Sequence, residues 1–166
     1  AIGSVVTGIS PKEMVGRGTG VDDRGISNKL ETVVKGIRIN QPNALDGLDV
    51  LAKVGGFEIG GIAGCVLAAA FHSRPVVIDG FISTAGALIA YSLCPHVRDY
   101  IIAGHCSEET GHRNMLKYIG IEPVLDLGMR LGEGTGGALA MSIMEGAICV
   151  FNEVFTFDEA GVADKD

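Results

Sequence analysis

The sequence contains no Trp, and aromatic residues make up only 5% of its 166 residues. Its apolar content of 47% therefore comes mainly from small and aliphatic side chains. Together with 25 glycines, these allow neighbouring backbones to approach closely, as in α/β layers. Basic residues are also few, and a net charge of −7 argues against nucleic-acid binding as the main activity. A small phosphate ligand is still compatible, because a glycine-rich loop with one Lys can bind phosphate locally.

Features that point to metals, secretion or membranes are also missing from the sequence. None of the four cysteines lies in a Cys-x-x-Cys pair or a zinc spacing, so we expect no metal ion and no cofactor. Cys65 and Cys149 fall in apolar helical segments, where we expect buried free thiols. No signal-peptide pattern is visible, and the apolar stretches 59–71 and 81–93 are too short and too rich in glycine to span a bilayer. We therefore expect a reducing, cytoplasmic location and no membrane contact.

Strand patterns alternate with helical patterns along the chain. Arg74–Asp79 and Tyr100–Gly104 are typical of buried strands, 14–15 is a brief strand candidate, and 123–129 fits a strand or a short helix. Helices are expected at residues 1–7, 28–37 (from a capping box), 47–54, 59–71, 81–93, 112–118 and 136–155. This alternation predicts an α/β layered, Rossmann-like fold with a mostly parallel sheet and helices on both faces.

The two ends of the chain predict its domain organisation. Residues 1–7, closed by Gly8, are typical of the end of a helix, so we expect the chain to be part of a longer polypeptide. Residues 1–155 are then expected to be one part of an α/β domain that is incomplete by itself. The polar segment 156–166 is predicted to be a C-terminal tail.

A glycine-rich loop is the first candidate binding element. Gly16-Arg-Gly-Thr-Gly20 presents backbone N–H groups with few side chains in the way, and Lys29 follows at the start of the next predicted helix. A backbone nest with one positive charge suits a monophosphate. The loop lacks the Gly-Lys-Ser/Thr ending of a Walker motif and is not a convincing dinucleotide fingerprint. A purely structural turn is the alternative.

Acidic residues beside glycines are the second group of candidates. Glu133 is the single acid in the glycine-rich stretch Met129–Gly137, where missing side chains let another molecule approach its carboxylate. We interpret it as a candidate catalytic base, and the alternative is a favourable acid near a helix N-terminus. Asp79 ends a buried strand and Glu58 follows two glycines; each could accept a ligand hydroxyl or organise its loop.

A polar segment at 105–109 contains a neighbouring His and Cys. A nucleophilic Cys–His pair requires a defined orientation of both side chains. We expect instead a structural His105 in a polar loop.

Seven segments of the chain, in order over about residues 1–155, match a known family. They are Val15-Gly-Arg-Gly-Thr-Gly-Val-Asp-Asp23, Asn28-Lys29, Asn40-Gln-Pro42, Asp46-Gly-Leu-Asp-Val-Leu51, Lys53-Val-Gly-Gly-Phe-Glu58, Val77-Ile-Asp-Gly-Phe-Ile-Ser83 and Met129-Arg-Leu-Gly-Glu-Gly-Thr-Gly-Gly-Ala-Leu-Ala-Met141. The chain thereby resembles the C-terminal half of the nicotinate-nucleotide–dimethylbenzimidazole phosphoribosyltransferases.

The resemblance implies an activity and its residues. The family moves phosphoribose from nicotinate mononucleotide to 5,6-dimethylbenzimidazole, giving α-ribazole 5′-phosphate and nicotinate in cobalamin lower-ligand synthesis. It implies that Glu133 is the general base. The implied ligand-binding residues are Gly18, Thr19, Gly20 and Lys29 for the phosphate, and Glu58, Asp79, Leu131 and Gly132 for the rest of the substrates. The resemblance further implies a homodimer.

Two other functions fit the same residues. One is a related phosphoribosyltransferase that uses another base, such as adenine, or a phenolic acceptor. The other is an inactive fragment, or a subunit whose site a second chain completes.

Overall fold

The computed structural model describes residues 1–18, 20 and 22–162. In chain order the elements are α1 (Ile2–Thr7), α2 (Pro11–Met14), α3 (Asp23–Asn40), α4 (Gly47–Val54), α5 (Phe57–Phe71), β1 (Val76–Ile78), α6 (Phe81–Leu93), the 3₁₀ helix η1 (Pro95–Tyr100), β2 (Ile101–Ser107), α7 (Thr110–Ile119), β3 (Pro123–Met129) and α8 (Thr135–Glu153). The described strands form one parallel sheet in the order β1-β2-β3.

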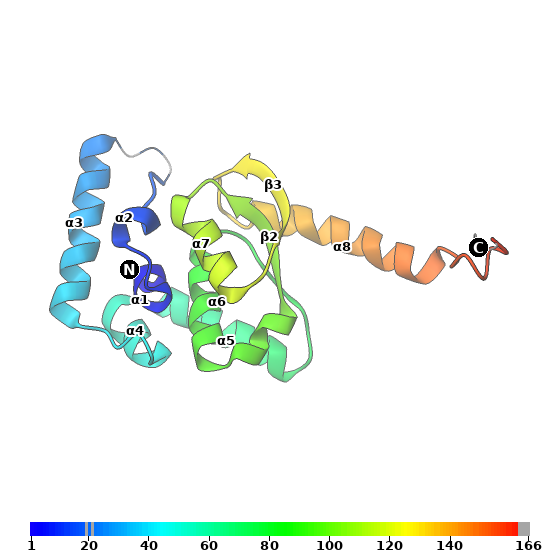
Figure 1. The fold of residues 1–166 in the computed structure, drawn as a ribbon, viewed down its shortest axis with the longest axis horizontal. Coiled ribbons are helices and arrows are strands. Elements are labelled where there is room, and N and C mark those ends of the chain that lie inside the picture. The colour runs from blue at the N-terminus through cyan, green and yellow to red at the C-terminus, as the bar shows by residue number, and fades with distance from the viewer. Residues whose placement is uncertain (19, 21, 163–166) are drawn as a thin grey trace.

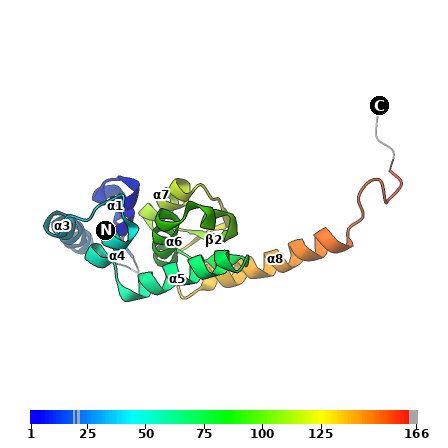
Figure 2. The same cartoon turned by 90° about the horizontal axis from the view of Figure 1, so that it is seen from below.

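Helices cover both faces of this sheet. The crossovers through α6 and α7 step in the same direction across the sheet, and right-handed crossovers then place both helices on one face. The start of α8 lies on the other face, because a Cβ on Gly104 of β2 would be only 2.9 Å from the Cα of Gly137. Figure 2 shows α8 leaving the sheet on the side away from α7. The predicted α/β fold with a parallel sheet is confirmed.

The core is centred on α6. Every residue of this helix from Thr84 to Ala90 is buried, between the sheet, α5, α7 and the N-terminal helices. Gly86 has no side chain because α5 crosses there, and a Cβ would overlap Ile62. The segments α1 to α4 lie together on the side of α6 and α7 opposite to the projecting end of α8 (Figure 1). They form one wall of the cavity described below.

Several predicted helix and strand positions are corrected by the structure. The segment 14–15 is not a strand: α2 ends at Met14, and its start is capped by the Ser10 hydroxyl, which accepts from the N–H of Glu13 at 3.4 Å. Helix α3 begins at Asp23 rather than at the capping box, because Asp22 Oδ1 accepts from the N–H of Gly25 at 2.8 Å. The start of the predicted polar loop 105–109 belongs to β2, which continues to Ser107.

Two of the thiols and most of α8 are more exposed than expected. Cys65 and Cys149 are exposed, whereas Cys106 is buried. Only the start of α8 meets the sheet, since its buried residues are Gly136, Gly137 and Ala140. The rest of the helix projects from the sheet (Figure 1), and its apolar content therefore remains on the surface.

Helix α8 is also the one helix in the described residues that is long and apolar enough to cross a membrane. Its length and composition meet this criterion, but core helices of globular proteins can have the same length and composition. Only 17% of its apolar window is buried against the rest of the chain. Such a helix needs a partner surface to remove its apolar side chains from water.

Candidate functional site

The glycine-rich loop and Lys29 meet in the structure. Gly18 and Gly20 have φ values of 61° and 134°, which favour glycine. The Lys29 ammonium donates to the carbonyl of Gly16 at 3.4 Å, and a Cβ on Gly18 would lie 3.2 Å from the same Nζ. Lys29 therefore lies over the loop, as a phosphate site requires. Thr19, predicted with them, lies outside the described residues.

A cavity of about 510 Å³ opens beside this loop. Gly18, Lys29 and Glu58 line it together with apolar side chains of α1, α3, α5 and α6. Glu109, at the start of α7, also lines the cavity, and a Cβ on Gly16 would overlap its carboxylate. The cavity thus combines one cation, two carboxylates and an apolar wall.

Glu58 is placed by the start of α5. A Cβ on Gly56 would lie 2.5 Å from Glu58 Oε1, so the carboxylate folds back over the first turn of its own helix. The positive end of the helix dipole stabilises an anion at this position. Gly56 therefore leaves room for the carboxylate of Glu58 in this position.

Glu133 lies in a left-handed turn between β3 and α8. Gly132, Glu133 and Gly134 have φ values of 80°, 60° and 78°. The left-handed conformation costs an ordinary residue roughly 1–2 kcal/mol and is found preferentially at functional sites. The side chain of Glu133 is exposed, as is that of Leu131. Such a backbone presents the carboxylate to solvent and to any ligand at this edge.

Arg130 connects this turn to the glycine-rich loop. Its guanidinium donates to the carbonyl of Gly18 at 3.4 Å, across 112 residues of sequence. The predicted base and the predicted phosphate loop are therefore neighbours, although Glu133 does not itself line the cavity. Arg130 stands three residues before Glu133 in the same motif, and no sequence pattern had singled it out.

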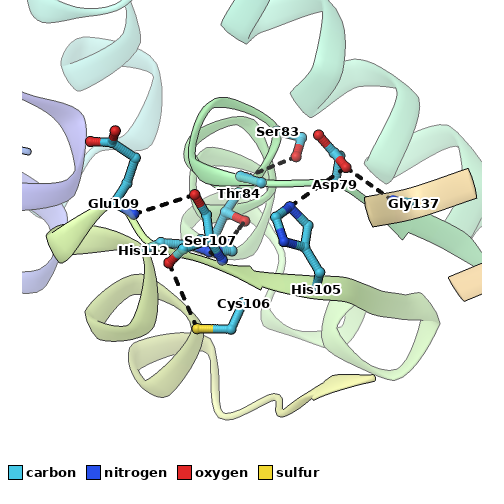
Figure 3. A network of polar contacts seen from close by, with 10 residues as sticks. Asp79, Ser83, Thr84, His105, Cys106, Ser107, Glu109, His112 and Gly137 are labelled. Atoms are coloured by element: carbon cyan, nitrogen blue, oxygen red, sulfur yellow. Dashed lines mark hydrogen bonds and ion pairs between the residues drawn. The ribbon is translucent and has the colours of Figure 1, made fainter. Parts of the chain in front are cut away.

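Asp79 organises the start of α8. Its Oδ1 accepts from the N–H of Gly137 at 3.0 Å, which satisfies one of the free donors in the first turn of the helix. His105 Nε2 lies 3.7 Å from the same oxygen (Figure 3). The second carboxylate oxygen points away from both partners. Through Oδ1, Asp79 thus holds the first turn of α8 in place, while its Oδ2 bonds neither Gly137 nor His105.

A buried histidine continues this network. His112 Nδ1 accepts from the N–H of Ser107 at 2.8 Å, so the neutral ring carries its proton on Nε2 and donates to the Thr84 hydroxyl at 2.8 Å. Burial lowers the pKa of His112 to about 4, and neighbouring His105 adds to this, while Asp79 opposes it. His112 is therefore neutral at physiological pH.

Cys106 does not form a nucleophilic pair with the preceding His105. Burial raises the pKa of its thiol, and its Sγ faces the carbonyl of Ser107 at 3.8 Å. Among the residues that the structure describes, no three His, Cys, Asp or Glu side chains are grouped as a metal site requires. The chemistry of this edge therefore rests on carboxylates and on two cations.

Comparison with known proteins gives the family. The family model described as Phosphoribosyltransferase matches residues 1–162. The chain belongs to this phosphoribosyltransferase family. The chain is 56% identical to a nicotinate-nucleotide–dimethylbenzimidazole phosphoribosyltransferase of Geotalea uraniireducens over 166 residues, which are 100% of this chain and 47% of that protein. The enzyme of the same name from Geobacter sulfurreducens is 54% identical, over the same shares.

Solved structures of phosphoribosyltransferases agree with the fold. CobT from Thermus thermophilus superposes with a TM-score of 0.92 at 41% identity, over 99% of this chain and 49% of that one. The chain spans about half the length of the curated relatives it matches. The predicted family is confirmed, and the position of the chain in the family's C-terminal half stays a prediction.

The neutral His112 of this phosphoribosyltransferase chain predicts acid sensitivity. Its folded pKa of about 4 lies below the unfolded value of 6.5, so the unfolded state binds more protons between these values. The stabilisation that the neutral His112 contributes is therefore complete above about pH 6.5 and is lost as the pH falls towards 4. We expect the free energy of unfolding to drop by about 2 kcal/mol between pH 7.5 and pH 5 from this group.

Urea unfolding of the complete protein, this chain with the other half of its relatives' length, measures the effect. The variant His112→Leu is expected to lose this part of the pH dependence, although it is less stable at pH 7.5. The variant His72→Leu alters an exposed histidine and serves as the control. An unchanged pH dependence in His112→Leu would contradict the prediction.

Proposed function

We propose that this chain, together with the rest of its relatives' length, transfers phosphoribose from nicotinate mononucleotide to 5,6-dimethylbenzimidazole. The products are α-ribazole 5′-phosphate and nicotinate, used in cobalamin lower-ligand synthesis. One observation carries the proposal: Arg130, from the turn that holds Glu133, is hydrogen-bonded to Gly18 in the glycine-rich loop. A candidate base and a candidate phosphate site therefore lie at one edge of the molecule.

Glu133 is the general base in this mechanism. Nicotinate leaves from a ribosyl pyridinium, already a good leaving group, so one carboxylate suffices where a glycosidase needs two. One benzimidazole nitrogen attacks C1′ while the other loses its proton to Glu133. Attack opposite the leaving group inverts the anomeric centre from β to α.

The phosphate is assigned to the glycine-rich loop. Backbone N–H groups of Gly18, Thr19 and Gly20 supply donors, and Lys29 supplies positive charge. Arg130 adds a second cation next to the loop.

The remaining contacts are assigned to residues around the cavity and the turn. Glu58 lies in the cavity wall, where a carboxylate can accept from ribose hydroxyls. Asp79 has one oxygen free of Gly137 for the same purpose. Leu131 and Gly132, which precede the base, are assigned to the benzimidazole because an exposed Leu can cover an aromatic ring.

Partners and location complete the proposal. We infer that the complete enzyme is a cytoplasmic homodimer, and that the other half of its length supplies much of the benzimidazole pocket. The second candidate function is a related enzyme that uses adenine or a phenolic acceptor. An apolar cavity with two carboxylates is compatible with more than one aromatic base.

A direct assay tests the proposed function. The complete enzyme is incubated with nicotinate mononucleotide and either 5,6-dimethylbenzimidazole, adenine or phenol, and the products are separated by chromatography. We expect α-ribazole 5′-phosphate to form fastest. A faster reaction with adenine or phenol would favour the second candidate, and no product with any acceptor would reject transferase activity.

The phosphate assignment predicts a selective binding defect. Replacing Lys29 by Ala removes a charged donor above the loop, which is worth roughly 1.5–3 kcal/mol, or about tenfold to a hundredfold in affinity. We expect this loss for nicotinate mononucleotide and not for 5,6-dimethylbenzimidazole, as measured by calorimetric titration of each ligand. Lys35→Ala, an exposed lysine on the same helix, is the matched control. Equal weakening of both ligands would indicate a folding defect instead.

A further inference from the structure

His105 is buried with an unsatisfied polar atom. The residue is 2% exposed, and its Nδ1 has no hydrogen-bond partner within the described part of the chain. A buried polar group without a partner typically costs about 1–3 kcal/mol, which an apolar ring of the same size would avoid. The presence of a histidine here is therefore better explained by the contact of its other nitrogen, Nε2, than by the packing of its ring.

One edge of the imidazole faces Asp79 and the start of α8. Nε2 lies 3.7 Å from Asp79 Oδ1, longer than a hydrogen bond but within the range of an ion-pair contact. The ring also lies directly against Gly136, where a Cβ would overlap it. Asp79 in turn holds the N–H of Gly137 at 3.0 Å. His105 thus touches the first turn of α8 directly and also through Asp79 (Figure 3).

The anchored turn is joined to the turn of Glu133. Gly134 has no side chain that could cap α8. Asp79 takes the place of a cap, because its carboxylate accepts from the free N–H of Gly137. Glu133 lies three residues before Gly136, in the left-handed conformation. A backbone in this conformation persists when surrounding contacts fix it. The contacts at Gly136 and Gly137 help to hold the helical side of this turn, together with the hydrogen bond from the N–H of Thr135 to the carbonyl of Gly132 at 3.2 Å.

We propose that His105 is a positioning residue for Glu133, acting through Asp79 and the first turn of α8. This inference rests on the proposed function, in which Glu133 is the base. His105 touches neither substrate, and its role is to keep the carboxylate of Asp79 on Gly137 and the backbone of Gly136 in place. A displacement of a catalytic group by about 1 Å can lower a rate by about a hundredfold.

The variant His105→Phe separates positioning from packing. Phe keeps a ring against Gly136 and removes the unsatisfied nitrogen, so the melting temperature is expected not to fall. In the complete enzyme we expect kcat to fall about 10- to 100-fold, a larger change than any rise in the KM for nicotinate mononucleotide, whose ribose is also assigned to Asp79. His105→Gln, whose amide can reach the place of Nε2, is expected to recover part of kcat. Hydrogen exchange at the start of α8 should be faster in His105→Phe than in wild type.

A double-variant comparison decides between the outcomes. In a Glu133→Gln background, His105→Phe is expected to cause no further loss, because there is no base left to position. A full additional loss in that background, or wild-type kcat and exchange in His105→Phe, would overturn the positioning role and leave the proposed function intact. A fully active Glu133→Gln enzyme would instead overturn the assignment of Glu133 as the base, and the positioning role with it. The proposed function itself would fail only if the wild-type enzyme formed no product with any acceptor.

Discussion

Replacing Glu133 by Gln is expected to lower the transfer rate by about 10²–10⁴-fold, the usual effect of losing a general base. Gln has nearly the same shape, and the side chain is exposed, so the fold and the affinity for nicotinate mononucleotide should stay unchanged. The amide cannot accept the proton that benzimidazole loses on attack. The rate of α-ribazole 5′-phosphate formation at saturating substrates measures the effect in the complete enzyme.

Glu145 offers a matched control for this experiment. It is an exposed glutamate on α8, downstream of the part of the helix that contacts the sheet. Glu145→Gln makes the same chemical change and should keep wild-type turnover. Turnover within about threefold of wild type in Glu133→Gln would remove Glu133 from the mechanism.

Residues 1–166 produced alone are expected to self-associate and to have no transferase activity. The reason is the part of α8 that projects from the sheet (Figure 2), together with the segment that follows it. Their exposed apolar side chains are Leu139, Met141, Ile143, Ile148, Val150, Phe151, Val154, Phe155 and Phe157. Exposed apolar surface of this kind drives association in water. Light scattering and the transferase assay measure both parts of the prediction.

Two further samples test the cause of self-association. Co-production with the other half of the relatives' length should give a defined assembly with turnover, because its surface can cover α8. A variant with Phe151→Ser and Phe155→Ser should self-associate less while the sheet remains folded, since both side chains are largely exposed. A monomeric, cooperatively melting and active 166-residue chain would contradict the prediction.

Local sequence patterns predicted most of the fold. The apolar run that ends in Asp79 is strand β1, and the small-residue pattern after Gly80 is helix α6. Helix α2 and the true start of α3 were missed, because caps outweighed local propensity: Ser10 turned the segment before Val15 into a helix, and Asp22 started α3 early. These caps are visible in the sequence, so a stricter search for them would have found α2 and the start of α3.

The site was less predictable, because its contacts are distant in sequence. The glycine loop and Lys29 are close along the chain and also in contact in the structure, while their role in binding phosphate stays a prediction. The bond from Arg130 to Gly18 depends on how β3 ends beside the N-terminal loop, which no spacing rule contains. His105 was assigned to a loop because its burial arises from packing on α8, some thirty residues later in the chain.

Because Glu133 has a left-handed backbone, the residue that would be most stable at this position is not the one that the proposed reaction needs. Glycine adopts this conformation without strain, so Glu133→Gly would relieve roughly 1 kcal/mol in the folded state, offset in part by the greater freedom of glycine in the unfolded chain. Under the proposed mechanism the same change removes the base. Directed selection on folding alone would therefore favour loss of the carboxylate, and any such campaign on this enzyme has to select for turnover at the same time.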